Sequence, residues 1–289
     1  MGHQTRSEKI FDIANYVLLA VIAFIMFFPL LYVFSVSFSS MHDFITKDFI
    51  LWPENWETKA YQYIFGNDQF IRSIFVSIYV TIVGTFINLF FTSTMAYGLT
   101  RNAQGQKFIL MAVVFSLIFQ AGMIPTYLIV NNTGLMDTTW ALMLPIAIAP
   151  FNLIVMRQFF MNIPNELTES AHVDGANELQ IFWKIILPLS KPALAAIGLF
   201  YAVNHWNNYF HAMLYITDPA KWPIQVVLRQ MVITQDMTIN PEEIFQGAPP
   251  PPETIQMAAI IVATIPILIV YPFLQKHFAK GVMLGAVKG

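Results

Sequence analysis

The sequence predicts an all-α integral membrane protein with six transmembrane helices and a helical knob on the cytoplasmic side between spans four and five. Hydrophobic residues make up 56% of the 289 residues and charged residues only 11%, against about a quarter charged in an ordinary soluble domain. Six uncharged runs approach or exceed the length that a membrane crossing needs. A short charged stretch separates the fourth run from the fifth.

The six runs define the predicted spans, because a hydrocarbon core of about 30 Å takes about 20 helical residues to cross. The fourth run is the shortest, and two histidines lie in the fifth. The first ends in bulky residues instead of a small-residue cleavage site, so we interpret it as a retained helix and not as a signal peptide. The runs are Ile13 to Met41, Ser73 to Thr100, Phe108 to Met136, Thr138 to Met156, Pro192 to Thr217 and Thr254 to Gln275.

The distribution of Lys and Arg predicts the orientation. With the N-terminus in the cytoplasm, ten of the fifteen basic residues fall on the cytoplasmic side, as the positive-inside rule requires. Residues 1–12 are then a cytoplasmic N-terminus, 13–275 the six-span domain with the knob at 164–187 and an outer loop at 218–253, and 276–289 a cytoplasmic tail. The predicted location is the cytoplasmic membrane of a bacterium.

Composition excludes several functions. With no Cys, the chain has no disulfide and no thiolate nucleophile. A net charge of −2 without a basic block argues against nucleic-acid binding. No glycine-rich phosphate loop is present, so we expect no cofactor in this chain. The span cores hold no Asp, Glu, Lys or Arg, which leaves His205 and His211 as candidates for a proton path, with hydrogen bonding as the alternative.

The knob reads as two short helices joined by a tight turn. Pro164 opens the first, Gly175 closes it, and Asn177 caps the second with Gln180 in the capping-box position. Apolar residues then recur at helical spacing until Pro188, which we expect to end the helix. These residues alone are compatible with a docking element or with an ordinary elbow that holds spans four and five apart.

The stretch ESAHVDGANELQIFWKIILPL, residues 169–189, resembles the cytoplasmic signature of binding-protein-dependent ABC importer permeases. That signature runs Glu-Ala-Ala, three residues, Gly, then Ile-x-Leu-Pro, and here Ser170 replaces the first Ala. The resemblance continues through WNNYFHAMLYI (206–216) and the final KGVMLGAVKG, which are typical of the sugar-importer branch. Within it the chain is most similar to permeases for complex oligosaccharides of the alginate and heteropolysaccharide type.

The resemblance implies that the knob is a coupling helix seated in a cleft on a separate ATPase subunit. The docking helix and its turn would comprise Glu169, Ser170, Ala171, Asp174 and Gly175, and the second helix would be anchored by Ile185, Leu187 and Pro188. Asp174 has capping of the adjacent turn as its alternative role.

The resemblance also implies partners. They are a second homologous permease, two ATPase subunits that bind ATP and Mg, and an extracytoplasmic sugar-binding protein that meets the outer loop, unless that loop is a simple lid. The glycine-rich tail, which we expect to be extended or irregular in isolation, would be ordered by reaching between the ATPase subunits, with a frayed end on the lipid headgroups of the bilayer as the alternative.

Span five carries the clearest signal for a substrate. Amide, aromatic and imidazole side chains follow helical spacing on it, and such groups suit the hydroxyls and apolar faces of a sugar. The alternative is that the amides bond to a neighbouring helix as packing contacts. The pathway candidates are Tyr201, Asn204, Asn207, Asn208 and His211, with Gln120 and Asn152 as weaker ones, while Trp206 is assigned to packing.

The sequence therefore predicts a permease subunit of an ATP-driven oligosaccharide importer, with no catalysis of its own because no nucleophile, base and orienting group converge. The alternative is an autonomous ion-coupled secondary transporter.

Overall fold

The structure is a computed structural model, and it describes residues 6–101, 104–233 and 250–286 of the chain. Within these ranges all regular structure is helical apart from an isolated antiparallel bridge between Ser39 and Trp56. The all-α prediction is confirmed for these residues. In chain order the helices are α1 Arg6–Ser37, α2 Met41–Thr46, α3 Lys59–Phe65, α4 Asp68–Gly98, α5 Gln106–Ile118, α6 Met123–Asn132, the 3-10 helix η1 Thr139–Leu142, α7 Pro150–Met161, α8 Asn165–Val173, α9 Glu178–Ile181, the π-helix η2 Phe182–Ile186, α10 Leu187–Leu189, α11 Lys191–Trp206, α12 Phe210–Tyr215, the 3-10 helix η3 Pro219–Lys221, α13 Ile224–Ile233 and α14 Pro252–Ala286.

Three of the described helices are long and apolar enough to cross a membrane unbroken. The segments are Lys9–Ser37, Asp68–Gly98 and Pro252–Val270. Two further pairs of helices are long and apolar enough only when each pair is taken together. α5 and α6 meet at a bend of 119°, and the stretch Glu178–Leu189 meets α11 at a bend of 80°. If each bent pair is one crossing, the described residues provide up to five, and the count of six stays a prediction.

The run Thr138–Met156, predicted as span four, is not one continuous helix. It contains η1, an irregular stretch around Pro145, and the first half of α7, which begins at Pro150. Proline has no N–H to donate and forces the preceding residue into extended conformations. Ala149 has such a conformation, at φ −90° and ψ 122°. The span was predicted from a count of apolar residues, and such a count does not reveal a helix break at a proline.

The prediction of an irregular tail is wrong as far as Ala286, because α14 continues to that residue. Gly281 and Gly285 lie inside the helix, and each disfavours it by about 1 kcal/mol relative to Ala. A helix that is already nucleated extends by one hydrogen bond per added residue. The long apolar part of α14 supplies that nucleus. Residues 287–289 lie outside the described ranges.

The short helix predicted at the start of the outer loop, over residues 223–232, is confirmed as α13. Most of the remaining loop, 234–249, lies outside the described residues.

The chain divides into two compact units, Met1–Asp68 with Leu228–Thr264 and Gln69–Val227 with Ile265–Gly289. In the first unit, Asp43 organises the turn that follows α1. Its carboxylate accepts the backbone N–H of Glu54 at 3.0 Å and of Asn55 at 2.9 Å, and its side chain has no exposed surface. These bonds close residues 41–57 into one loop at the end of α1.

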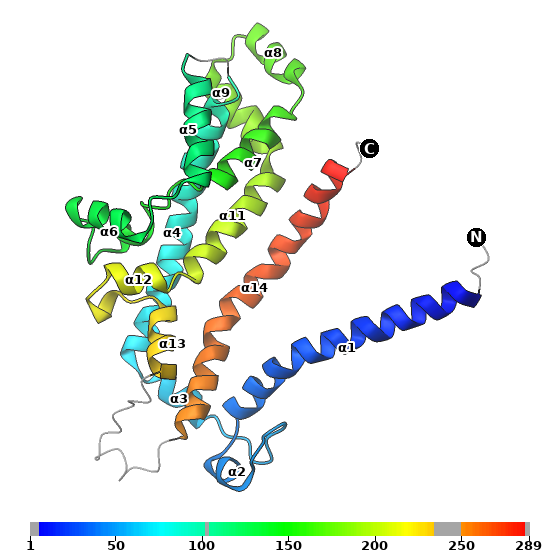
Figure 1. Ribbon diagram of the computed structural model, residues 1–289, viewed down its shortest axis with the longest axis vertical. Coiled ribbons are helices and arrows are strands. Elements are labelled where there is room, and N and C mark those ends of the chain that lie inside the picture. The colour runs from blue at the N-terminus through cyan, green and yellow to red at the C-terminus, as the bar shows by residue number, and fades with distance from the viewer. Residues whose placement is uncertain (1–5, 102–103, 234–249, 287–289) are drawn as a thin grey trace. The chain divides into compact units, whose positions relative to one another are not determined.

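The second unit contains the helices that matter for function. Figure 1 shows α5, α7 and α11 alongside α4, with α8 beyond one end of this group. The knob and the polar residues of span five therefore belong to the same unit.

A corner of the second unit is held by Asp137, which has the left-handed φ of 58°. Its Oδ1 accepts the N–H of Asp218 at 2.9 Å and of Thr217 at 3.1 Å, and its Oδ2 lies 3.1 Å from Lys221 Nζ. The backbone bond from Asp218, followed by the ammonium of Lys221, holds the pKa of Asp137 below its ordinary value. We call these four residues the Asp137 corner.

Candidate functional site

Three breaks interrupt the helices of the second unit. Residues 119–122 separate α5 from α6, residues 143–149 separate η1 from α7, and residues 207–209 separate α11 from α12. Irregular backbone at membrane depth is tolerated only where it is buried in protein or lines a water-filled cavity. The breaks are therefore the places to look for a polar site.

A cavity of about 520 Å³, which we call the central cavity, opens beside the first two breaks. Four of the predicted pathway side chains meet in its wall: Gln120 from the first break, Asn152 from α7, and Tyr201 and Asn204 from α11. The full lining is Ser116, Gln120, Pro145, Ile146, Ile148, Ala149, Pro150, Phe151, Asn152, Phe200, Tyr201 and Asn204. The structure thus joins the weaker candidates to the stronger ones in one site.

A second cavity of about 500 Å³, the adjoining cavity, shares Ser116 and Gln120 with the first. His211 lines it, together with the aromatic rings of Phe119 and Phe210. The described walls of both cavities offer amides, hydroxyls and rings, and they contain no Asp, Glu, Lys or Arg. Their chemistry suits a hydroxyl-rich ligand better than a metal or a proton relay.

Tyr201 supports the broken chain beside the central cavity. Its hydroxyl accepts the backbone N–H of Ala149 at 3.0 Å and shares a 2.8 Å hydrogen bond with Thr92 Oγ1. Ala149 is the residue before α7, and its side chain cannot cap the helix. The hydroxyl of Tyr201 is therefore committed to the protein, and its ring is what remains for the cavity.

Asn88 on α4 supports the same irregular stretch. Its side-chain amide donates to the carbonyl of Ile146 at 2.5 Å, and its oxygen lies 2.6 Å from His205 Nε2. Because that oxygen can only accept, His205 Nε2 carries the proton. This confirms the hydrogen-bonding role predicted for His205.

The close approach of α4 and α11 depends on Gly84. A Cβ at this position would lie 2.5 Å from His205 Nε2, well inside van der Waals contact. Sequence reasoning missed both Gly84 and Asn88. A small residue and a lone amide four positions apart on α4 were the only signals.

The prediction that the polar residues of span five share one face of one helix is wrong. α11 ends at Trp206 and α12 begins only at Phe210. Asparagine side chains compete with the backbone for hydrogen bonds and favour helix ends, which explains why the Asn-Asn pair falls in the break.

Asn207 and Asn208 have different surroundings. Asn207 is exposed as the C-cap of α11, whereas Asn208 is 9% exposed and its oxygen lies 3.0 Å from His211 Nδ1. Neither residue is among the lining of the two cavities. The Asn208 contact is a packing contact, and a role in transport stays a prediction for both. Trp206 is buried, as expected for packing.

The knob comprises α8, the turn 174–177 and the helical stretch 178–189. The turn reverses the chain at Gly175, which has φ 82°. Around it the N–H groups of residues 174, 175 and 176 donate to the carbonyls of Ser170, His172 and Ala171. Such a left-handed closure favours glycine, so the predicted helix end is confirmed.

The second knob helix begins as predicted but does not end where predicted. Asn177 and Gln180 form the capping box with bonds of 2.9 and 3.0 Å. The helix then runs past Pro188 to Leu189, because η2 precedes the proline. A π-type turn, in which the N–H of Leu187 bonds to the carbonyl of Phe182, shifts the hydrogen-bond register that a proline would otherwise break.

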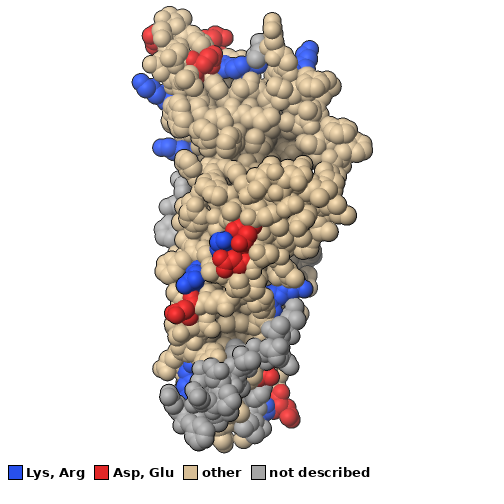
Figure 2. Space-filling view, turned by 90° about the vertical axis from the view of Figure 1, so that its left-hand side faces the viewer, with Lys and Arg blue, Asp and Glu red and all other residues tan. Residues whose placement is uncertain are grey.

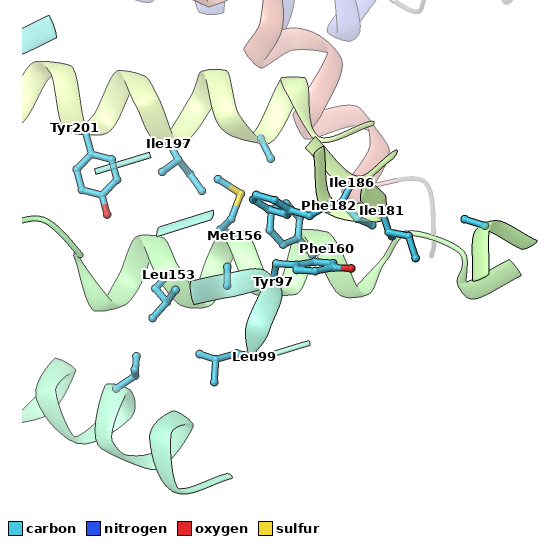
Figure 3. Close-up of a cluster of buried hydrophobic side chains, with 14 residues drawn as sticks. Tyr97, Leu99, Leu153, Met156, Phe160, Ile181, Phe182, Ile186, Ile197 and Tyr201 are labelled. Atoms are coloured by element: carbon cyan, nitrogen blue, oxygen red, sulfur yellow. The ribbon is translucent and has the colours of Figure 1, made fainter. Parts of the chain in front are cut away.

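Apolar side chains fasten the knob to the bundle. Ile181, Phe182 and Ile186 are at most 3% exposed, and Figure 3 shows them beside Met156 and Phe160 of α7. Of the residues predicted as anchors, Ile185 and Leu187 pack partly buried against this cluster, while Pro188 is exposed.

The outward side of the knob is free in this chain. Among the predicted docking residues Glu169, Ser170, Asp174 and Gly175 are exposed, and Ala171 instead packs within the cluster at 9% exposure. Figure 2 shows acidic and basic side chains gathered at the end where α8 lies. Val173 on α8 is 88% exposed there.

Glu178, the first residue of α9, ties the knob to α4 through side chains only. Its Oε2 accepts the hydroxyl of Tyr97 at 2.5 Å and lies 3.2 Å from Arg101 Nε, and its Oε1 lies 3.3 Å from His172 Nε2. Arg101 in turn donates to the Tyr97 hydroxyl at 2.5 Å. We call these four residues the Glu178 clamp. Sequence reasoning missed it because its members are spread over 81 positions.

Among the described residues no group of three or more His, Asp or Glu side chains is placed to hold a metal ion.

Comparison with known proteins gives consistent results. The family model described as binding-protein-dependent transport system inner membrane component matches residues 1–284. The polygalacturonan/rhamnogalacturonan transport system permease protein YtcP of Bacillus subtilis (strain 168) is 51% identical over 284 residues, or 98% of this chain and 99% of the relative. Protein LplC of the same organism is 50% identical over 288 residues, covering 99% and 98%.

Among solved structures, the chain is similar to one from a bacterial ABC transporter involved in the import of the acidic polysaccharide alginate. The TM-score is 0.91 at 34% identity, with 96% of this chain and 100% of that chain covered.

Proposed function

The chain belongs to the family of binding-protein-dependent transport system inner membrane components, and we propose that it conducts acidic oligosaccharides into the cell. It is the permease component of an ABC importer for sugars or oligosaccharides, located in the inner membrane. The finer assignment concerns its substrate, its partners and the way in which the knob drives transport.

The convergence of Gln120, Asn152, Tyr201 and Asn204 on the central cavity carries the proposal. Amide groups both donate and accept hydrogen bonds, so they match sugar hydroxyls and ring oxygens in many orientations. Phe151 and Phe200 add flat apolar surfaces to the same wall, which suit the apolar faces of a sugar ring. A wall of this kind binds a passing chain without holding it tightly.

The acidic nature of the substrate is supported by the relatives. One is a permease for polygalacturonan and rhamnogalacturonan, and a structural neighbour belongs to an importer of alginate. The described cavity walls contain no carboxylate that would repel a uronate and no Lys or Arg that would trap it. Amide N–H groups and the imidazole of His211 are the proposed partners for its carboxylates.

The proposed assembly contains a second permease, two ATPase subunits that bind ATP and Mg, and an extracytoplasmic binding protein. The exposed outward side of the knob fits the cleft of an ATPase subunit, and both termini then lie in the cytoplasm. Closure of the ATPase pair pushes the knob and switches the cavities between outward and inward access. The outer loop meets the binding protein, and the end of α14 reaches between the ATPase subunits.

Reconstitution of the complete complex in proteoliposomes tests this function. We expect uptake and ATP hydrolysis to be stimulated by the binding protein loaded with oligogalacturonides or alginate oligosaccharides, and much less by neutral oligosaccharides of equal length. A complex with an inactive ATPase serves as control. Uptake that persists with this control and collapses with the ion gradient would establish a secondary transporter instead.

A further inference from the structure

The Glu178 clamp joins the knob to α4, two parts of the fold that lie between the proposed ATPase contact and the central cavity. Glu178 starts the second knob helix, and His172 lies on α8, so one carboxylate spans both knob helices. Tyr97 and Arg101 lie at the end of α4, one inside the helix and one just beyond it. The clamp is therefore the polar connection between knob and α4.

The side chains of the clamp contact both oxygens of the Glu178 carboxylate. Oε2 receives Tyr97 and faces Arg101, while Oε1 faces His172, so both oxygens are engaged. The Arg101 guanidinium lies 4.7 Å from the centre of the Tyr97 ring, within the range of a cation–π contact. An amide in place of the carboxylate would supply one acceptor oxygen and no charge.

The same α4 holds the wall of the central cavity. Thr92 bonds to the Tyr201 hydroxyl and Asn88 bonds to Ile146 and His205. Asn88 and Tyr97 lie nine residues apart on an unbroken helix, or roughly 13 Å at 1.5 Å per residue. A helix of this length moves as one piece, so a displacement at Tyr97 reaches the cavity wall.

From these contacts we propose that Glu178 is a positioning residue that transmits movement of the knob to α4 and hence to the central cavity. The proposal rests on the proposed function, because it requires an ATPase that moves the knob. The apolar cluster around Phe182 keeps the knob attached to the bundle. The clamp makes α4 follow when the knob is displaced. Without the clamp the knob still docks, but its displacement is absorbed by the turn instead of by α4.

The test compares Glu178→Ala with Glu166→Gln in the assembled complex. Glu166 lies in the first turn of α8 and is exposed, so it is a charge-matched control on the same knob. We expect the complex with Glu178→Ala to retain the ATPase subunits and their basal ATP hydrolysis. Its uptake of substrate should fall roughly tenfold. Glu166→Gln should transport like the unaltered protein.

Two further variants separate positioning from folding. Tyr97→Phe keeps the ring that packs on Phe182 and removes only the hydroxyl, so it should lose part of the uptake with normal thermal stability. The charge-exchanged pair Glu178→Arg with Arg101→Glu should recover uptake relative to either single change. A merely structural role predicts that the thermal stability falls in each single variant and recovers together with uptake, whereas positioning predicts normal thermal stability in all of them.

Spin labels at Val173→Cys and Phe91→Cys report the movement directly, because the chain has no native Cys and both sites are exposed. Trapping with nucleotide should change the distance between knob and α4 by a larger amount in Glu178→Ala. Equal distance changes with and without Glu178, or uptake by Glu178→Ala within twofold of normal with the ATPase bound, would overturn the positioning role. Failure of the unaltered protein to bind any ATPase would instead overturn the proposed function, and this inference with it.

Discussion

The crossing of α4 and α11 and the knob are both held by polar contacts, but of opposite kinds. At the crossing the groups are buried: Asn88 has no exposed surface and His205 is 3% exposed. In the clamp the side chain of Glu178 is 53% exposed and that of Arg101 32%. The crossing also has no spare room at Gly84, while nothing lies within 4 Å of a Cβ placed at Gly175.

This difference indicates which part is fixed and which part moves. A buried hydrogen bond is expensive to break, because its groups find no water when they separate. Exposed charged contacts exchange for water at little net cost. In the proposed mechanism the crossing would serve as a pivot beside the central cavity, and the knob would serve as the lever that a partner displaces.

The comparison is tested most sharply by replacing a glycine with a larger residue in each region, Gly84 at the crossing and Gly175 in the knob. Gly84→Val forces a side chain onto His205 Nε2, 2.5 Å from the added Cβ. We expect loss of the folded permease, since the ring is packed between two helices and overpacking costs about 1–3 kcal/mol or more. Membrane-inserted, detergent-stable protein measured by size-exclusion fluorescence should fall to a small fraction.

Gly198→Ala is the control, because the added Cβ would meet the flexible side chain of Leu89, with Cδ1 at 3.2 Å. It should leave the yield nearly unchanged. A normal yield of Gly84→Val would show that the crossing is not tight.

Tyr201→Phe should have the second-largest effect on stability. It removes the hydroxyl that accepts from Ala149 and bonds to Thr92, and a buried donor left unsatisfied costs about 1–3 kcal/mol. The expected result is a lower melting temperature together with reduced uptake, because the wall of the central cavity loosens. Thermal unfolding of the purified complex checks it, and an unchanged melting temperature would argue that water replaces the hydroxyl.

Gly175→Leu tests the knob and should separate folding from transport. The site is open in this chain, so the main cost is the left-handed φ of 82°, about 1–2 kcal/mol for a residue with a side chain. We expect an inserted permease with a slightly lower melting temperature that no longer transports, because the side chain would stand against the proposed ATPase cleft.

Gly175→Asn is the control, since Asn tolerates the left-handed region better, and it should retain part of the uptake. Normal transport by Gly175→Leu would remove the docking role of the turn.

Asn204→Ala tests the wall of the central cavity and leaves the contacts of the α4–α11 crossing and of the knob unchanged. Asn204 is exposed toward the central cavity, so the melting temperature should stay the same. A lost hydrogen bond to a sugar hydroxyl corresponds to about 0.5–1.5 kcal/mol, or a two- to tenfold decrease in uptake. Asn207→Ala, outside the lining of both cavities, is the matched control. Equal uptake by the two variants would contradict the assignment of the wall.

The Asp137 corner should give the smallest effect, and it extends the comparison to a second set of exposed charged side chains. The pKa of Asp137 lies below its ordinary value because of the Asp218 N–H and Lys221. A depressed carboxyl pKa stabilises the fold at neutral pH, and the contribution is lost as the pH falls below about 4. The melting temperature of Asp137→Asn should therefore lie slightly below normal at pH 7, and the gap should narrow toward pH 3. A gap that does not depend on pH would show that charge plays no part in the corner.

The sequence by itself determined the features whose causes are local. The apolar runs, the capping box of Asn177 and Gln180, and the left-handed turn at Gly175 each depend on residues a few positions apart, so spacing and composition were sufficient to predict them. The polar residues of span five were recognised for the same reason, although the helix break at Asn207 and Asn208 was not.

Only the tertiary structure decided which of these residues meet. Asn88 reaches Ile146 across 58 positions, Tyr201 reaches Ala149 across 52, and Tyr97 reaches Glu178 across 81. Each contact gives a polar group a partner that the local sequence does not supply, and the choice of partner depends on how the helices pack and not on any pattern along the chain. Pro145 and Pro150 open a gap in an apolar run, but whether that gap becomes a loop or the wall of a cavity depends on α4 and α11, which supply the missing hydrogen bonds.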